Sequence, residues 1–179
     1  MSKKYFYILE GPDRAGKSTL AAKISKHLAI RTSVVAFHMT YTHKLGKCMG
    51  DYQNNVYDNL IWSHLELDLS VVMDRSWISN QVYGSVVNPQ EMCDWTDIQL
   101  RLRNLGAVYI LCDTPHILSL HEEDKDERHA YDEDQFRQIV NRYRSLREDL
   151  AITDNVIPYD RTTDGTDIPK FMSETLGII

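Results

Sequence analysis

YFYILEGPDRAGKSTLAAKISKHL, residues 5–28, is the stretch that decides the fold of this 179-residue chain. Its first five residues are apolar or aromatic, which is typical of a buried strand. Apolar residues then recur every four positions, at Leu20, Ile24 and Leu28, which predicts a helix. Between them, residues 11–18 satisfy the pattern G-x-x-x-x-G-K-[ST]. A strand, this loop and a helix in direct succession predict a phosphate loop, in which backbone N–H groups surround an anion at the positive end of the helix.

The polar residues of the phosphate loop (residues 11–18) have distinct expected roles. We expect the ammonium group of Lys17 to contact the β- and γ-phosphates of a nucleotide, and the Ser18 hydroxyl to ligate Mg²⁺. Asp74 ends another apolar run, Val71–Met73, and we expect it to complete the Mg²⁺ site, although a strand-terminal aspartate is also a common turn residue. The other phosphate-binding positions predicted here are Gly11, Asp13, Arg14, Ala15, Gly16 and Thr19.

Outside the loop, short apolar runs rich in β-branched residues alternate with helical periodicity. Strands are predicted at 5–9, 33–37, 71–73, 107–112 and 155–159. Helices are predicted directly after the loop and at 54–69, 95–105, 134–150 and 169–176. This alternation favours a three-layer α/β/α fold with a central five-stranded parallel sheet. We find no composition break, so residues 1–179 are expected to form a single domain.

The segment 121–134, HEEDKDERHAYDED, lies between the fourth predicted strand and the helix at 134–150. A long connection inside a compact domain is typical of an active-site lid. A run of charges is equally typical of a solvated loop. We therefore expect a short lid here, with the solvated loop as the alternative.

Composition favours a soluble protein of the cytoplasm. The net charge of −6 argues against a surface that coats nucleic acid, and three cysteines without regular spacing do not form a disulfide framework. No apolar run approaches the ~18 residues that a membrane span requires. The N-terminus leads directly into the first predicted strand, which leaves no room for a cleavable signal. We therefore expect a cytoplasmic location and no membrane partner.

Three segments resemble thymidylate kinases. LEGPDRAGKSTL, residues 9–20, is similar to their phosphate loop, [LF]-E-G-x-D-[RG]-A-G-K-S-T, and DRSWISNQVYG, residues 74–84, is similar to their second signature, D-R-x-x-x-S-x-x-x-Y. Residues 126–146 resemble their lid and the helix that follows it. The segments cover about a quarter of the chain, in the family's order. The resemblance implies a P-loop kinase that uses ATP and Mg²⁺ to phosphorylate a deoxypyrimidine nucleotide, and it suggests a homodimer.

The resemblance also implies catalytic roles for residues of the loop and the lid. In one subclass of thymidylate kinases an arginine at the position of Arg14 lies over the transferring phosphoryl group. The short supply of basic residues in the lid, where Arg128 is expected to contact the ATP phosphates, is consistent with this subclass. Asp13 would reach the sugar 3′-hydroxyl of the acceptor. Glu10 would be either a general base for a hydroxyl acceptor, as in deoxynucleoside kinases, or a structural carboxylate.

The second signature implies an acceptor site. Arg75 would bind the phosphate or the 5′ end of the acceptor, Ser79 and Asn80 would hydrogen-bond a pyrimidine edge, and Tyr83 would favour deoxyribose. Two family features are missing. The segment at residues 37–47, FHMTYTHKLGK, replaces an R-E-P-G-G segment, and His38, His43 and Lys44 are candidate substitutes there. The segment at residues 56–68, VYDNLIWSHLELD, replaces an F-x-x-x-R helix, and Trp62 is expected to be either a stacking face or a core residue.

These departures leave the identity of the acceptor open. A deoxynucleoside monophosphate is our leading expectation. The same machinery could phosphorylate a hydroxyl instead, either on a deoxynucleoside or on a modified base within DNA. A P-loop ATPase or switch module is a third alternative, but Arg75, Ser79 and Tyr83 would then share no purpose.

Overall fold

The computed structural model of the chain describes residues 3–39, 48–87, 94–118, 131–153, 155–161 and 167–178. Within these ranges five strands form one sheet: β1 (Phe6–Glu10), β2 (Val34–His38), β3 (Ser70–Asp74), β4 (Val108–Asp113) and β5 (Asn155–Asp160). Their order in the sheet is β2-β3-β1-β4-β5, and each neighbouring pair is parallel. The predicted five-stranded parallel sheet is confirmed.

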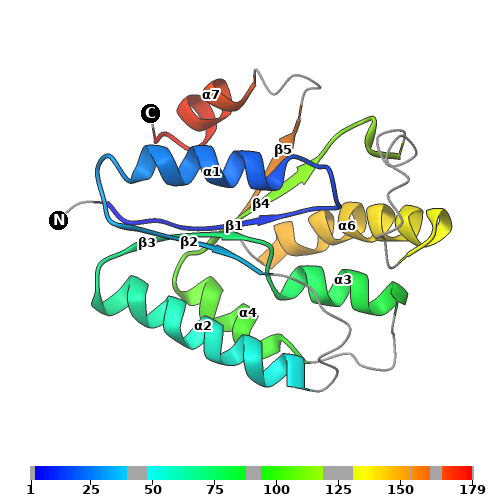
Figure 1. The fold of residues 1–179 in the computed structure, drawn as a ribbon, viewed down its shortest axis with the longest axis horizontal. Coiled ribbons are helices and arrows are strands. Elements are labelled where there is room, and N and C mark those ends of the chain that lie inside the picture. The colour runs from blue at the N-terminus through cyan, green and yellow to red at the C-terminus, as the bar shows by residue number, and fades with distance from the viewer. Residues whose placement is uncertain are drawn as a thin grey trace.

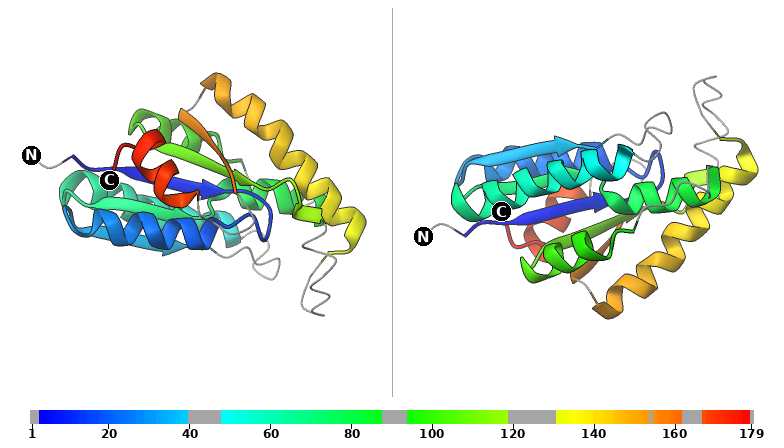
Figure 2. Two further views of the ribbon diagram at one scale, coloured as in Figure 1. Left: turned by 90° about the horizontal axis from the view of Figure 1, so that it is seen from above. Right: turned by 90° about the horizontal axis from the view of Figure 1, so that it is seen from below.

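Helices cover both faces of this sheet (Figures 1 and 2). One face is covered by α1 (Lys17–Leu28), the short helix α7 (Ile168–Lys170) and the π-helical turn η3 (Phe171–Thr175). The other face is covered by α2 (Cys48–Glu66), α3 (Trp77–Val87) and α4 (Thr96–Asn104), while α6 (Glu133–Thr153) lies beside α3 and β5. The described helices include none that is both long and apolar enough to cross a membrane. The arrangement is the predicted three-layer α/β/α fold.

The central strand β1 shows why the sequence forms this sheet. All five of its residues are buried, as expected for a parallel strand with helices on both faces. Phe6 and Ile8 belong to the core beneath α2, α3 and α4, whereas Tyr7 and Leu9 belong to the core beneath α1, α7 and η3. The continuous apolar run therefore supplies two cores at once and fixes β1 in the middle of the sheet.

Most predicted strands and helices begin and end within three residues of the observed ones, and the largest difference is in α2. The helix predicted at 54–69 is α2, which begins at Cys48 and ends at Glu66. It stops early because Asp68 has a left-handed backbone, with φ of 55°, that cannot continue a helix. The lid predicted at 121–134 lies outside the described residues except for its last four positions, of which the final two begin α6.

Candidate active site

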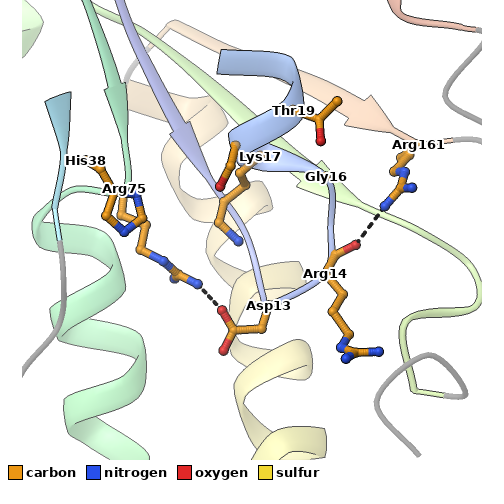
Figure 3. A pocket seen from close by; sticks show the side chains of 9 residues that line it. Asp13, Arg14, Gly16, Lys17, Thr19, His38, Arg75 and Arg161 are labelled. Atoms are coloured by element: carbon orange, nitrogen blue, oxygen red, sulfur yellow. Dashed lines mark hydrogen bonds and ion pairs between the residues drawn. The ribbon is translucent and has the colours of Figure 1, made fainter. Parts of the chain in front are cut away.

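A cavity of about 390 Å³ opens where the carboxyl ends of the strands meet (Figure 3). Its lining residues are Asp13, Arg14, Gly16, Lys17, Ser18, Thr19, His38, Arg75 and Arg161. Four of these carry a permanent or near-permanent positive charge and one is acidic, in a chain whose net charge is −6. Open parallel sheets bind ligands at this edge. The charge balance of the cavity therefore favours an anionic ligand.

Two glycines allow the phosphate loop to curl at this edge. Gly11 has φ of 144°, and a Cβ there would lie 2.1 Å from the carbonyl oxygen of Cys112 on β4. Gly16 has φ of 83°, and a Cβ there would lie 2.6 Å from Cδ of Arg161. Only glycine tolerates both the left-handed backbone and the close approach. Gly11 is thus required by its close packing against the backbone of β4, and Gly16 by its left-handed backbone.

Two arginines of the cavity also have left-handed backbones. Arg14 has φ of 68° and Arg75 has φ of 76°; among the described residues Asp68 is the only other non-glycine residue with positive φ. Such a backbone costs about 1–2 kcal/mol per residue and is concentrated at functional sites. Figure 3 shows the Arg14 side chain directed away from Lys17. To lie over a phosphoryl group at Lys17, as the resemblance implies, its guanidinium would have to rotate.

Lys17 is the buried cation at the centre of the loop. Its Nζ donates a hydrogen bond to the carbonyl oxygen of Pro12 at 2.6 Å. Burial, reinforced by the nearby Arg75 guanidinium, lowers the pKa of Lys17 to about 8. A bound polyphosphate would supply the compensating negative charge that this ammonium group lacks.

Ser18 and Asp74 form an oxygen pair suited to Mg²⁺. Ser18 Oγ donates to Asp74 Oδ2 at 2.6 Å, and His38 Nδ1 lies 3.0 Å from the same carboxylate oxygen. The other oxygen, Asp74 Oδ1, is buried and has no hydrogen-bond partner among the described residues. Mg²⁺ prefers such oxygen ligands and keeps several waters or phosphate oxygens besides. The residues present therefore fit the predicted metal, with His38 beside Asp74 at the end of β2.

Glu10 is fully buried at the end of β1 and joins β1 to α3 and α6. Its Oε1 accepts hydrogen bonds from the backbone N–H and hydroxyl of Ser76 and the backbone N–H of Ser79. Its Oε2 accepts from Ser79 Oγ at 2.7 Å and from Tyr143 Oη at 3.1 Å. These donors occupy the lone pairs that a general base would use. The structure therefore favours the structural interpretation of Glu10, as a carboxylate at the N-terminus of α3.

Asp13 is held by groups from two other parts of the chain. Its Oδ1 accepts from the Arg75 guanidinium and its Oδ2 from the Tyr131 hydroxyl, while its backbone N–H donates to Tyr83 Oη at 3.2 Å. Burial by itself would raise the pKa of Asp13, but Arg75 and Tyr131 outweigh it and hold the pKa below its ordinary value. Asp13 is therefore a paired carboxylate rather than an open acceptor.

Arg75 is oriented from three sides. Besides its ion pair with Asp13, it donates to Ser79 Oγ at 3.1 Å, and its guanidinium carbon lies 5.3 Å from the centre of the Tyr83 ring. The charges and hydroxyls around it raise the pKa of Arg75 despite its burial, so it stays protonated. The structure thus brings Arg75, Ser79 and Tyr83 of the second signature together beside the phosphate loop.

Other predicted site residues lie elsewhere. Asn80 is 6% exposed and does not line the cavity, but neither atom of its amide has a hydrogen-bond partner among the described residues. Ala15 is packed in the core beneath the loop, and Arg128 lies outside the described residues.

Trp62 requires a correction. Its side chain is 54% exposed on the outer face of α2 and does not line the cavity. His64, two residues later, packs against Phe6 at the start of β1, because α2 runs back along the sheet. Trp62 is therefore far along α2 from the cavity, and its assignment to the acceptor site is not supported.

Four residues of this region were not assigned from the sequence. They are Ser76, Tyr131, Tyr143 and Arg161. Tyr143 falls in the apolar stripe of the long predicted helix, so the sequence predicts a core residue and not the hydrogen bond from its hydroxyl to Glu10. Of these four residues, Arg161 could have been predicted from the sequence. It follows the last predicted strand and must therefore lie at the ligand-binding edge of the sheet.

Known proteins are similar to this chain in structure rather than in sequence. No protein-family model and no curated protein sequence matches it. The YorR protein of Bacillus subtilis, solved in complex with phosphorylated GDP, is 20% identical with a TM-score of 0.66 over 96% of each chain. Deoxyadenosine kinase from M. mycoides with bound dATP is 15% identical, with a TM-score of 0.63 over 96% of this chain and 98% of that one.

Thymidylate kinase from Candida albicans is also similar. It is 13% identical, with a TM-score of 0.58 over 99% of this chain and 94% of that one. Likeness at such identities establishes the fold. The chain has the fold of P-loop nucleotide kinases, as the sequence predicted.

Proposed function

We propose that this protein is an ATP- and Mg²⁺-dependent kinase that phosphorylates a deoxypyrimidine nucleotide, with a deoxynucleoside monophosphate as the leading acceptor. The observation that carries the proposal is one cavity lined by Lys17, Ser18 and Arg75, with Asp74 hydrogen-bonded to Ser18 directly behind it. These residues would supply a cation for the donor phosphates, a metal site and a second anion site next to one another. The kinase names of the similar structures agree with this interpretation.

The donor side would act mainly through charge. Lys17 would contact the β- and γ-phosphates, and the loop N–H groups would bind the remaining phosphate oxygens. Ser18 and Asp74 would hold Mg²⁺, which would offset the negative charge of the β- and γ-phosphates. In the transfer, an acceptor oxygen forms a bond to the γ-phosphorus. At the same time the bond between the γ-phosphorus and the oxygen that bridges it to the β-phosphate breaks, and ADP leaves with that oxygen. Arg14, once rotated, would stabilise the charge on the equatorial oxygens.

The acceptor side favours a monophosphate. Arg75 is fixed by Asp13, Ser79 and the Tyr83 ring while it still lines the cavity, so it would position an acceptor phosphate for attack. An acceptor phosphate oxygen is already nucleophilic and needs no general base. This matches the engagement of every oxygen of Glu10 and Asp13 in protein hydrogen bonds.

Asn80 is a candidate to recognise a pyrimidine base, on condition that the site opens, because its side chain is buried and does not line the cavity. Its amide nitrogen, with two N–H donors, and its amide oxygen have no hydrogen-bond partner among the described residues. Buried polar groups are rarely left so, and an amide of this kind pairs well with the edge of a nucleobase.

A deoxynucleoside 5′-hydroxyl is the second candidate acceptor. It is favoured by the similarity to deoxyadenosine kinase and by the absence of the R-E-P-G-G sequence between residues 37 and 47. It would require Glu10 or Asp13 to accept a proton and therefore to give up a protein partner. A DNA acceptor, a homodimer and a cytoplasmic location remain predictions from the sequence.

The test is a transfer assay with radiolabelled ATP and Mg²⁺ over dTMP, dUMP, dCMP, thymidine, deoxyadenosine and duplex DNA. We expect label on a monophosphate, and none with the Lys17→Ala variant as the matched control. Label confined to a nucleoside would establish the second candidate, and label confined to DNA would establish a base kinase. Free phosphate that does not depend on any acceptor would overturn kinase activity in favour of an ATPase.

A further inference from the structure

Arg161 lines the cavity from a segment that the proposed transfer does not use. Its backbone N–H donates to the carbonyl oxygen of Asp113 at 2.8 Å, which extends the pairing of β5 with β4 by one residue. Its side chain then reaches back to the phosphate loop, beside Gly16 and Arg14 (Figure 3). One guanidinium nitrogen donates to the carbonyl oxygen of Arg14 at 3.2 Å, and Cδ lies where a side chain at Gly16 would have to be. The guanidinium is thus held in place against the loop.

The position of Arg161 identifies the part of the donor that it faces. Lys17, which marks the β- and γ-phosphates in such a loop, extends toward Asp13 (Figure 3). Arg161 lies on the other side of the loop, beyond Gly16. A triphosphate with its terminal phosphate at Lys17 therefore extends its nucleoside toward Arg161.

The ion pairing of the arginines near the cavity also suggests a ligand for Arg161. Arg75, Arg144 and Arg147 each pair with a carboxylate. In the described part of the chain no carboxylate pairs with Arg161, and its recorded side-chain hydrogen bond uses one of the five N–H donors of a guanidinium. A planar cation with its edge fixed and no acidic partner is well suited to pack on a flat aromatic ring.

We propose that Arg161 binds the donor nucleotide by packing its guanidinium on the nucleobase of ATP. This inference rests on the proposed use of a nucleoside triphosphate as donor. It adds a residue that selects the nucleoside part of the donor, whereas the phosphate loop selects the phosphates.

The test compares ATP with inorganic tripolyphosphate, each with Mg²⁺, in binding titrations without any acceptor. The main variant is Arg161→Lys, which keeps the charge and the aliphatic stem over Gly16 but removes the flat guanidinium; Arg161→Met is a second variant. Arg147→Lys is the matched control, because Arg147 pairs with Asp160 at the end of the same strand and does not line the cavity. Thermal unfolding of each variant verifies that the fold is retained.

We expect Arg161→Lys to raise the Kd for ATP by about 10-fold while the Kd for tripolyphosphate stays within about 2-fold. Arg147→Lys should change neither. Equal weakening of both ligands, or no weakening of either, would overturn the inference. Wild-type protein that binds ATP through Arg161 but phosphorylates nothing would remove the proposed function and leave this inference standing. Wild-type protein that does not bind ATP would overturn both.

Discussion

The two halves of the cavity are built differently. We define the acceptor half as Asp13 and Arg75 together with the residues of the hydrogen-bond network behind them, which are Glu10, Ser79, Tyr83, Tyr131 and Tyr143. The donor half consists of Gly16, Lys17, Ser18, Thr19 and Arg161. In the acceptor half the side chains bind one another: the Asp13 carboxylate pairs with Arg75 and Tyr131. In the donor half, within the part of the chain that the structure describes, the Lys17 ammonium group donates to a carbonyl oxygen and one buried oxygen of the neighbouring Asp74 has no partner.

This difference indicates what each half requires from its ligand. The acceptor half already balances the charge of Arg75 and holds its orientation, so it is preorganised. The donor half contains a buried ammonium group and a carboxylate oxygen whose best partners are a polyphosphate and a metal ion. We therefore expect variants of the donor half to affect transfer most and variants of the acceptor network to affect stability as well.

The largest effect is expected for Lys17→Ala. Removal of the ammonium group leaves the transferred phosphoryl charge uncompensated, and transfer should fall by about 1,000-fold or more. The initial rate of ATP-dependent labelling measures it. Lys23→Ala, an exposed lysine on the same helix α1, is the control and should retain full activity. Near-normal transfer by Lys17→Ala would contradict the assignment of the donor half.

The next largest effect is expected for Glu10→Gln, in stability. The amide cannot accept from all the donors that now surround the carboxylate, so we expect a loss of about 2–3 kcal/mol and a Tm lower by about 5–10 °C. Calorimetry measures this, with the exposed Glu148→Gln on α6 as control. An unchanged Tm with abolished transfer would instead identify Glu10 as a general base, and the acceptor half would not be the rigid network described above.

The third prediction compares Arg14→Gly with Arg14→Ala, which separates the effect of the guanidinium charge from that of the strained backbone. Loss of the guanidinium should lower turnover by about 100-fold with little change in ATP affinity. Glycine suits the φ of 68° at this position, so stability should be unchanged or slightly higher. Arg14→Ala is the matched control, since it removes the same charge but keeps the strained backbone. Turnover that survives both substitutions would show that Arg14 does not act on the transferred group.

The smallest effect is expected in acid, through Asp13. Because its folded pKa lies below the ordinary value of about 4, ionised Asp13 stabilises the fold fully above that pH, and the contribution is lost as pH falls through the folded pKa. Denaturant unfolding of the wild type and Asp13→Asn between about pH 7 and pH 3 should therefore show a stability difference that narrows only below about pH 4. A difference that stays constant throughout would mean that the pairing with Arg75 does not stabilise the fold.

The sequence predicted the donor half well, apart from Arg161, because its features are local. The glycines, Lys17 and Ser18 are fixed by a motif of eight residues between a strand and a helix, and Asp74 is fixed by its place at the end of an apolar run. The alternation of strands and helices likewise followed from periodicity, which depends on near neighbours. The element α2 was correctly predicted as a helix, and only the positions where it begins and ends were wrong.

The acceptor half, and the place of Arg161 in the donor half, depended on tertiary structure. Glu10 meets Tyr143 across 133 positions, Asp13 meets Tyr131 across 118, and Arg161 meets Arg14 across 147. No local pattern encodes these contacts, because they exist only where helices and strand ends pack together at one edge of the sheet. The sequence by itself determined the fold and the residues of the phosphate loop. Packing decided that Glu10 lies in a buried hydrogen-bond network, that Trp62 lies outside the cavity and that Arg161 lines it.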